Sequence, residues 1–347
     1  MTIRDVARQA GVSVATVSRV LNNSGPVSSS TRRRVEAVAE ALDYVPHGGA
    51  RSLITRRTTN LGVILPDLYG EFFSELIRGM DRATRAAGYH LLLSGSHAAD
   101  VELAAALRAM RGRVDGLILM SPEITPAELV ELIPRGLPVV LINTEVGKNG
   151  RFDTLNVDNR GGAYAAVQHL VSAGHSRIAL INGRLANHDA RERRLGYRRA
   201  LEEAGLESAS ELELESDFTK AGGQRAARAL LELEPRPTAV FAANDSMAVG
   251  ALSAFREAGL RVPDEMAVVG FDDIPIAEYV TPPLSTVKVD LLRFGERAVE
   301  LVVDSLTDPS GREPRDEIVE TQLVIRRSSD GAPGVAAVAG SAEERQL

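Results

Sequence analysis

Residues 13–22 read Ser13-Val14-Ala15-Thr16-Val17-Ser18-Arg19-Val20-Leu21-Asn22, and this stretch decides how the N-terminal part of the chain folds. Val17, Val20 and Leu21 repeat at positions i, i+3 and i+4, which is the spacing of an apolar stripe on one face of a helix. Ser13 stands where its side chain can accept a hydrogen bond from an unpaired backbone N–H at the helix start. The stretch therefore predicts a capped amphipathic helix.

Two further helices flank this one. Thr2-Ile3-Arg4-Asp5 has the form of a capping box with Asp in place of Glu, and it predicts a short first helix. Gly11 supplies the tight turn between the first and second helices. We expect a third helix to be capped by Ser30 or Thr31 and to run to about Leu42.

The open face of the second helix is free to enter a groove and carries Val14, Ala15, Ser18 and Arg19. A small helical cap of no special function would show the same amphipathic pattern, but the charge favours nucleic acid. Residues 1–60 contain nine arginines and four acidic residues, a net charge of +5, and the rest of the chain carries −12, for a total of −7. A basic head on an acidic body predicts phosphate contacts at one end of the chain. We therefore interpret residues 1–45 as a helix-turn-helix DNA-binding domain.

Amino-acid composition narrows the classes of protein to which the chain can belong. The 347-residue chain contains no cysteine, which excludes a disulfide framework, a thiol nucleophile and a cysteine-based zinc site. Its first residues are polar and charged, without the apolar segment of a signal peptide, and no apolar run has the length needed to cross a bilayer. We expect a cytoplasmic protein without a membrane partner.

Residues 46–60 join the head to the body. Their glycines, Gly48 and Gly49, favour a flexible linker, because each weakens a helix by about 1 kcal/mol relative to Ala. Ala50, Leu53 and Ile54 nevertheless have helical spacing beside a cluster of arginines, which is what a wedge for the DNA minor groove requires. Our hypothesis is a hinge that is disordered in the free protein and becomes helical on DNA.

The body alternates strands and helices. Apolar runs of buried-strand length are followed by amphipathic stretches, and the alternation restarts after Asn159, which predicts two doubly wound α/β lobes. The expected strands are 61–65, 91–93, 117–120, 139–142, 178–181, 239–242 and 267–270. The expected helices are 72–87, 99–111, 126–133, 159–173, 190–204, 221–231 and 246–258.

Polar residues follow these strands with unusual consistency. Ligands of parallel sheets bind beyond the carboxyl ends of the strands, and neutral amides, carboxylates and hydroxyls there suit a polyhydroxylated ligand. Each residue taken alone is better explained as a helix cap, whereas the whole set favours a ligand cleft. The set comprises Asp67, Tyr69, Ser94, Ser121, Asn143, Asn182, Asn244, Asp245, Asp272 and Asp273.

Enzymatic function finds little support. The sequence lacks dinucleotide, Walker, serine-hydrolase and zinc-protease motifs, and its six histidines have no metal-ligand spacing. Asp272 and Asp273 resemble the carboxylate pair of a glycosidase, but adjacent residues at a strand end point in different directions. We therefore expect no catalytic residue, no metal and no cofactor.

The motifs together resemble the LacI/GalR family of bacterial transcriptional regulators, from residue 2 to about residue 327. In the head the resemblance rests on residues 2–7, 11–13, 16–22 and 50–53. In the body it rests on Val157-Asp158-Asn159, Arg193, Gly196-Tyr197, Ala243-Asn244-Asp245, Gly270-Phe271-Asp272-Asp273 and residues 282–286.

The resemblance implies a homodimer that binds a pseudo-palindromic operator in double-stranded DNA. Val14 and Ala15 match the family's specificity positions, Arg19 its base-reading arginine and Leu53 its minor-groove wedge. The residues implied to contact DNA are Thr2, Ser13, Val14, Ala15, Thr16, Ser18, Arg19, Asn22, Ala50, Arg51 and Leu53.

The resemblance also implies a periplasmic-binding-protein-like core at 61–327 that takes a small sugar-like effector. Lobe 1 would hold about 61–158 and 291–317, and lobe 2 about 159–290 and 318–327, with a disordered tail at 328–347. Arg193 would clamp hydroxyls or an anionic group, and Phe218 would stack on a sugar face. The implied effector contacts are Phe72 or Phe73, Asn143, Asp189, Arg193, Phe218, Asn244 and Asp272.

These observations favour a ligand-responsive repressor of carbohydrate-utilisation genes. A solute-binding protein of a sugar transporter is the alternative, but it would require export, which the missing signal peptide opposes. An enzyme of sugar metabolism on an α/β scaffold is a third hypothesis, opposed by the absence of catalytic motifs.

Overall fold

The computed structural model describes residues 1–22, 24–44, 57–96, 100–145, 151–308 and 313–330. It divides into two compact units. The first contains Met1–Asn60 together with Met110–Asp115, and the second contains Leu61–Ala109 together with Gly116–Leu347.

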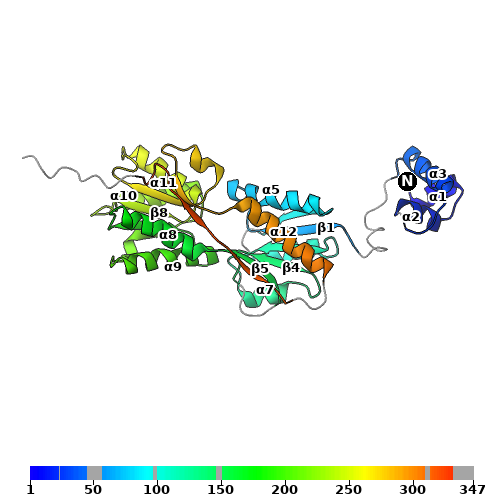
Figure 1. The fold of residues 1–347 in the computed structure, drawn as a ribbon, viewed down its shortest axis with the longest axis horizontal. Coiled ribbons are helices and arrows are strands. Elements are labelled where there is room, and N and C mark those ends of the chain that lie inside the picture. The colour runs from blue at the N-terminus through cyan, green and yellow to red at the C-terminus, as the bar shows by residue number, and fades with distance from the viewer. Residues whose placement is uncertain (23, 45–56, 97–99, 146–150, 309–312, 331–347) are drawn as a thin grey trace, which may run out of the picture. The chain divides into compact units, whose positions relative to one another are not determined.

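The first unit begins with three helices, α1 (Ile3–Ala10), α2 (Val14–Leu21) and α3 (Ser29–Ala41) (Figure 1). Gly11 ends α1 with a left-handed φ of 64°, which a residue without a Cβ adopts at little cost. The helices enclose a small apolar core that includes Val17 and Val20 of α2, as the repeat predicts. The other buried members are Val6, Ala7, Ala10, Val35 and Ala39.

The start of α3 differs from the expected one. Ser28, and not Ser30 or Thr31, is the N-cap, and its hydroxyl accepts a hydrogen bond from the Thr31 N–H at 3.3 Å. Residues 28–30 are all serine, so composition alone cannot place the cap. The cap must precede the first residue with helical dihedrals, and that residue is Ser29.

The second unit contains two six-stranded sheets, each covered by helices, which confirms the predicted α/β class (Figure 1). The sheet of lobe 1 has the order β11-β5-β4-β3-β1-β2. Its strands are β1 (Asn60–Leu65), β2 (His90–Gly95), β3 (Gly116–Met120), β4 (Val139–Ile142), β5 (Asp153–Val157) and β11 (Asp316–Val319). Its helices are α5 (Glu71–Ala86), α6 (Asp100–Met110), α7 (Pro126–Leu132) and α12 (Leu291–Thr307).

The sheet of lobe 2 has the order β12-β10-β9-β8-β6-β7, and β12 is antiparallel to β10. Its strands are β6 (Ile178–Asn182), β7 (Glu213–Glu215), β8 (Ala239–Ala242), β9 (Ala267–Asp272), β10 (Ser285–Lys288) and β12 (Gln322–Val324). Its helices are α8 (Asn159–Ser172), α9 (His188–Glu203), α10 (Lys220–Leu231) and α11 (Asp245–Glu257), with short 3₁₀ turns η1 (Ser210–Leu212) and η2 (Pro275–Glu278).

The chain crosses between the two sheets three times. The crossings lie at Asp158, at Asp290, and at Glu320 and Thr321 between β11 and β12, a few residues beyond the Glu317 expected from sequence. Asp158 and Asp290 also cap the helices that follow, accepting hydrogen bonds from the N–H groups of Gly161 and Arg293 at 2.8 and 3.0 Å. Each crossing from strand to helix is thus fixed by a carboxylate.

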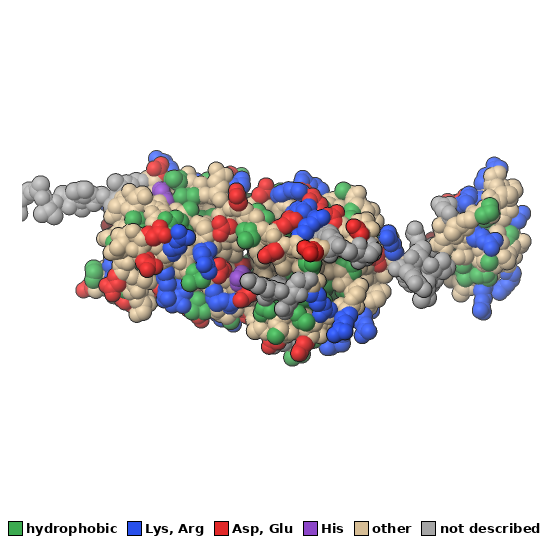
Figure 2. All heavy atoms as spheres, turned by 60° about the horizontal axis from the view of Figure 1, so that its bottom comes forward, with side chains coloured by type: hydrophobic (Ala, Val, Ile, Leu, Met, Phe, Trp, Pro, Cys, Tyr) green, Lys and Arg blue, Asp and Glu red, His purple; other side chains and the backbone are tan. Residues whose placement is uncertain are grey.

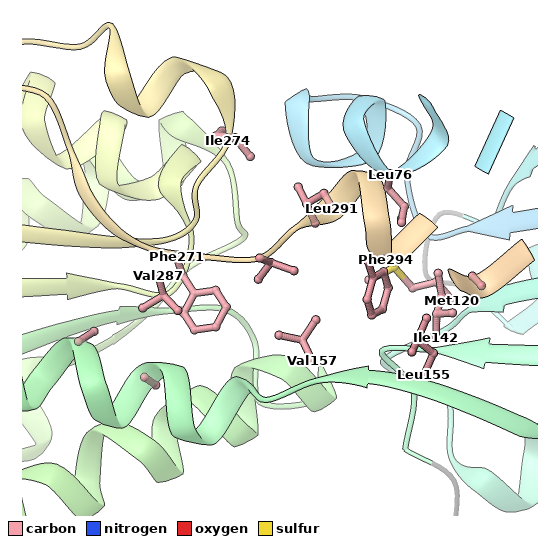
Figure 3. Close-up of a cluster of buried hydrophobic side chains, with 14 of the residues drawn as sticks. Leu76, Met120, Ile142, Leu155, Val157, Phe271, Ile274, Val287, Leu291 and Phe294 are labelled. Atoms are coloured by element: carbon pink, nitrogen blue, oxygen red, sulfur yellow. The ribbon is translucent and has the colours of Figure 1, made fainter. Parts of the chain in front are cut away.

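One apolar cluster continues through the crossings and joins the lobes. Figure 3 shows Phe271 and Val287 of lobe 2 on one side of Val157, and Leu291 and Phe294 of α12 on the other. In lobe 1, α5 and α12 approach so closely that a Cβ on Gly79 would overlap the Leu292 carbonyl oxygen. The sheets therefore share a core at their adjoining edges and are not two independent globules.

The last described residues are ordered parts of lobe 2, which differs from the expected start of the tail. Ser328 and Ser329, assigned to the disordered tail, are buried in lobe 2. Ser328 Oγ donates to the Val268 carbonyl at 2.6 Å, and Ser329 Oγ lies 2.8 Å from His169 Nε2. Small hydroxyl residues look like linker composition, but here their hydroxyls hydrogen-bond to groups in the interior.

Candidate functional site

The open face of α2 is the first candidate site. Val14 is 41% exposed, and Ala15 and Arg19 are also exposed, while Val17 and Val20 are buried on the opposite face. Asn22 Nδ2 donates to Ser18 Oγ at 3.2 Å along the same helix. The face therefore offers two small apolar side chains and one guanidinium, which suits contact with a groove floor.

The N-terminus of α2 adds hydroxyl groups. Ser13 Oγ accepts a hydrogen bond from the Thr16 N–H at 3.1 Å, and the two hydroxyl oxygens lie 2.9 Å apart. Thr2 makes the corresponding capping box on α1, where its hydrogen bonds to the Asp5 carboxylate lower the pKa of Asp5. Two helix N-termini with hydroxyl caps are suited to phosphate oxygens, because the helix dipole favours an anion there.

Basic side chains stand out on the surface of the three-helix head (Figure 2). Arg32 is part-buried, and its guanidinium donates to the Val20 carbonyl at 3.2 Å, which ties α3 to the end of α2. The exposed arginines are Arg4, Arg8, Arg19, Arg33 and Arg34. The predicted contacts Ala50, Arg51 and Leu53 lie outside the described residues.

Arg193 is the centre of the second candidate site, at the carboxyl end of the lobe 2 sheet. It projects from α9, is 3% exposed, and lies over the ring of Phe271 at 3.8 Å from the centroid. Its guanidinium donates to Asn159 Oδ1 at 2.7 Å, to Asp272 Oδ1 at 3.3 Å and to the Ala243 carbonyl. One buried cation thus contacts α8, the residue that follows β8, and the end of β9.

Two predicted carboxylates complete this group. Asn159 Nδ2 donates to Asp189 Oδ1 at 2.8 Å, so Asp189 is linked to Arg193 through one amide. Burial raises the pKa of Asp272 to about 7, although Arg193 opposes the shift, and burial likewise raises the pKa of Asp189. The structure therefore brings together three of the predicted effector residues, Arg193, Asp189 and Asp272.

Sequence reasoning gave Asn159 no role, and it placed Asp245 among the polar strand-end residues but not among the implied effector contacts. Asp245 is 0% exposed and accepts hydrogen bonds from Thr286 Oγ1 at 2.5 Å and the Ile274 N–H at 2.9 Å. Burial, reinforced by Asp272, raises its pKa well above the usual value. Both residues stand inside motifs that carried the family resemblance, which was the available signal.

Asn244 and Phe218 contact each other. Asn244 Oδ1 caps α11 by accepting from the Met247 N–H at 2.9 Å, and its Nδ2 donates to the Phe218 carbonyl at 3.1 Å. The Phe218 ring packs so closely on Gly183 that a Cβ there would overlap it. Asn244 therefore acts as the cap that the simpler interpretation predicts, while it also fixes the Phe218 loop.

The other predicted effector residues belong to lobe 1. Asn143 Oδ1 accepts from the Val157 N–H at 3.2 Å and braces β4 against β5. Phe72 and Phe73 pack edge to face at 5.1 Å in the first turn of α5. Asn143, Phe218 and Asp272 all have positive φ values, of 43°, 60° and 104°, and such strained backbone gathers at ligand sites.

Several contacts connect the lobes directly. The Glu71 carboxylate accepts from the Ile276 N–H at 2.9 Å, and the Pro122 carbonyl accepts from the His188 N–H at 2.8 Å. Arg191 of α9 pairs with Glu145, which follows β4, at 2.6 Å. These residues were not predicted as site residues, because partners this far apart in sequence are found only after folding.

Over the ranges that the structure describes, no helix has the length and apolar character needed to cross a membrane. Within the same ranges, no cluster of three or more His, Asp or Glu side chains is placed to hold a metal ion.

Comparison with known proteins gives matches along nearly the whole chain. Residues 2–47 match the bacterial regulatory proteins of the lacI family, and residues 167–329 match a periplasmic binding protein-like domain. The chain is 37% identical to the ribose operon repressor of Escherichia coli (strain K12), over 94% of this chain and 99% of that protein.

Solved structures of two transcriptional regulators also align with nearly the whole chain. The lac repressor dimer bound to operator and the anti-inducer ONPF aligns with a TM-score of 0.84 at 28% identity, covering 95% of this chain and 99% of that one. The transcriptional regulator CelR in complex with cellobiose aligns with a TM-score of 0.73 at 34% identity, covering 95% of this chain and 100% of that one.

Proposed function

This chain belongs to the lacI family of bacterial regulatory proteins, and from that premise we propose how it recognises DNA and which class of effector it binds. It is a ligand-responsive, DNA-binding transcriptional repressor that acts as a homodimer. The observation that carries the residue-level proposal is the open face of α2 on a basic head, combined with a buried arginine centre in the core. We assign the head to residues 1–45, the hinge to 46–60 and the effector-binding core to 61–329, since Ser328 and Ser329 are buried in lobe 2.

In the proposed complex, α2 lies in the major groove of each operator half-site. Arg19 donates to the O6 and N7 of a guanine, and Val14 and Ala15 contact thymine methyl groups, because neither can make a bidentate hydrogen bond. Phosphates and neighbouring bases are held by the polar residues Thr2, Ser13, Thr16, Ser18 and Asn22. Ala50, Arg51 and Leu53 enter the minor groove, with Leu53 as the wedge.

The effector is a small polyhydroxylated molecule, a sugar or sugar derivative. Arg193, Asp189 and Asp272 supply charged donors and acceptors for hydroxyl groups, and Phe218 offers a ring face. The names of the ribose operon repressor and of the CelR–cellobiose complex support this class. Phe72 or Phe73, Asn143 and Asn244 complete the proposed set.

Effector binding alters operator affinity because it favours one arrangement of the lobes over another. We assign the protein no catalytic residue, and we place its action in the cytoplasm, where its operator lies. The alternative, a solute-binding protein of a sugar transporter, would bind sugar but leave duplex DNA untouched.

The experiment begins by selecting operators from random-sequence duplexes with the full-length protein. Binding to the selected operator should weaken steeply as salt rises, since displaced counterions drive phosphate contacts. Arg19→Ala should cut discrimination between operator and random duplex by about 10- to 100-fold, the contribution of one bidentate base contact. Sugars are then screened for their effect on the complex. A protein that enriches no duplex at low salt would contradict the proposal.

A further inference from the structure

Asp115 holds the three residues through which the chain enters β1. Asp115 Oδ1 accepts hydrogen bonds from the N–H and the hydroxyl of Thr58, at 2.6 and 2.9 Å. Its Oδ2 accepts from the Thr59 N–H at 2.9 Å. Both oxygens of one carboxylate thus bind consecutive residues, and we call this arrangement the Asp115 clamp.

The clamp is reinforced on either side. The Asp115 N–H donates to the Asn60 carbonyl at 2.8 Å, and Asn60 Nδ2 donates to the Arg113 carbonyl at 2.9 Å. The Asn60 N–H donates to Thr58 Oγ1 at 3.3 Å. The residues of the clamp lead directly into two neighbouring parallel strands, since Leu61 of β1 pairs with Gly116 of β3.

Thr59 has a φ of 56°. The left-handed region is unfavourable for a β-branched side chain, and such a residue persists there only when its surroundings fix it. Glycine would adopt this conformation freely, so the clamp is what holds a threonine in it. The direction of the chain at this point is therefore set by hydrogen bonds and not by local preference.

We propose that Asp115 is a positioning residue for operator recognition. It fixes the direction in which the chain leaves β1 toward the DNA-reading head, so that the two heads of a dimer suit one spacing of the half-sites. If the chain could leave β1 in several directions, the second head would have a lower effective concentration at its half-site, although neither head itself would change. The inference rests on the proposed DNA-reading role of α2.

The test uses full-length protein and the selected operator, rebuilt with zero, one or two base pairs added or removed between the half-sites. A duplex with a single half-site measures each head alone. The wild type should prefer one spacing by about 10-fold or more, and Asp115→Asn should reduce that preference to within about 3-fold. Its affinity for the single half-site should stay unchanged, because the heads are intact.

Two further variants complete the design. Thr58→Val keeps the shape of the side chain but removes the hydroxyl that donates to Asp115 Oδ1 and accepts from the Asn60 N–H, so it should flatten the spacing profile without unfolding the protein. Asp81→Asn makes the same charge change in lobe 1, where Asp81 pairs with Arg85 at 2.5 Å on the exposed face of α5, and it should leave the profile unchanged. An unaltered spacing preference in both Asp115→Asn and Thr58→Val would overturn the inference. Failure of the wild type to bind the single half-site would instead overturn the proposed function.

Discussion

A single buried guanidinium organises the proposed effector site. Arg193 meets an amide oxygen, a backbone carbonyl, a carboxylate and an aromatic ring, and the linked Asp189 adds a second carboxylate through Asn159. The flat fork of arginine presents its donors in fixed directions while its face stacks on a ring, a combination that a lysine ammonium lacks. The site is consequently rich in charge and yet almost closed to water.

Removal of this cation should be costly. Arg193→Ala leaves Asp272 buried without its partner, and breaking one side of a buried pair destabilises proteins by about 3–5 kcal/mol. Arg199→Ala is the control, since Arg199 is 61% exposed in its pair with Glu203 and should cost less than about 1 kcal/mol. Urea unfolding of both variants gives the comparison. Equal losses would show that burial of the Arg193 pair has no energetic weight.

The titration of Asp272 predicts a pH dependence of stability. Its pKa is raised to about 7 in the folded protein, so the fold binds a proton that the unfolded chain has already released. The contribution is fully present below the unfolded pKa of about 4 and is lost as the pH rises to about 7, at about 1.4 kcal/mol per pKa unit. The difference in unfolding free energy between wild type and Asp272→Asn should therefore change between pH 4 and 7. Parallel pH profiles would refute the assignment.

Helix caps set where the elements begin. Ser28→Ala should destabilise the head by about 1 kcal/mol, because the Thr31 N–H loses its partner. Ser30→Ala is the matched control inside the first turn of α3, where Ala is the better helix former, and it should cost less than about 0.5 kcal/mol. Thermal unfolding followed by circular dichroism separates the two. A larger loss from Ser30→Ala would return the cap to the position expected from sequence.

The strands that sequence reasoning found are apolar, and those it missed are polar or very short; it also missed the long helix α12. The runs at β3, β4, β8 and β9 are buried along their length and read clearly as strands. In contrast, β5 alternates polar and apolar residues in Asp153–Val157, and β7 and β12 are only three residues long. Such strands form because the neighbouring strand offers hydrogen bonds, and a sequence window does not contain that neighbour.

The same limit applies to the site. Arg193 and Asp272 were predicted because they stand in recognisable motifs, and the structure joins them. The brace by Asn159 and the contacts of Glu71 and Glu145 across the lobes depend on residues tens to hundreds of positions away. A local stretch of sequence shows which residue types are present, whereas only the folded chain shows which of them hydrogen-bond to each other.

At the scale of the whole core, the Glu145–Arg191 pair reports how the lobes meet. The pair is partly exposed, so its coupling energy should be about 0.5 kcal/mol and should fall as salt rises. A double-mutant cycle with Glu145→Gln and Arg191→Gln, read out as operator affinity, measures that coupling. A coupling of zero would mean that the contact has no influence on operator binding.

The three crossings also bear on synthesis. Ribosomes deliver the reading helices first, whereas β11 and β12, which complete the two sheets, emerge among the last residues of the described chain. An mRNA with a stop codon before codon 316 would yield a polypeptide with the three complete helices of the head and two lobes whose sheets each lack a strand. Premature stop codons ahead of codon 316 are thus expected to abolish the response to the effector, and not merely to trim an end.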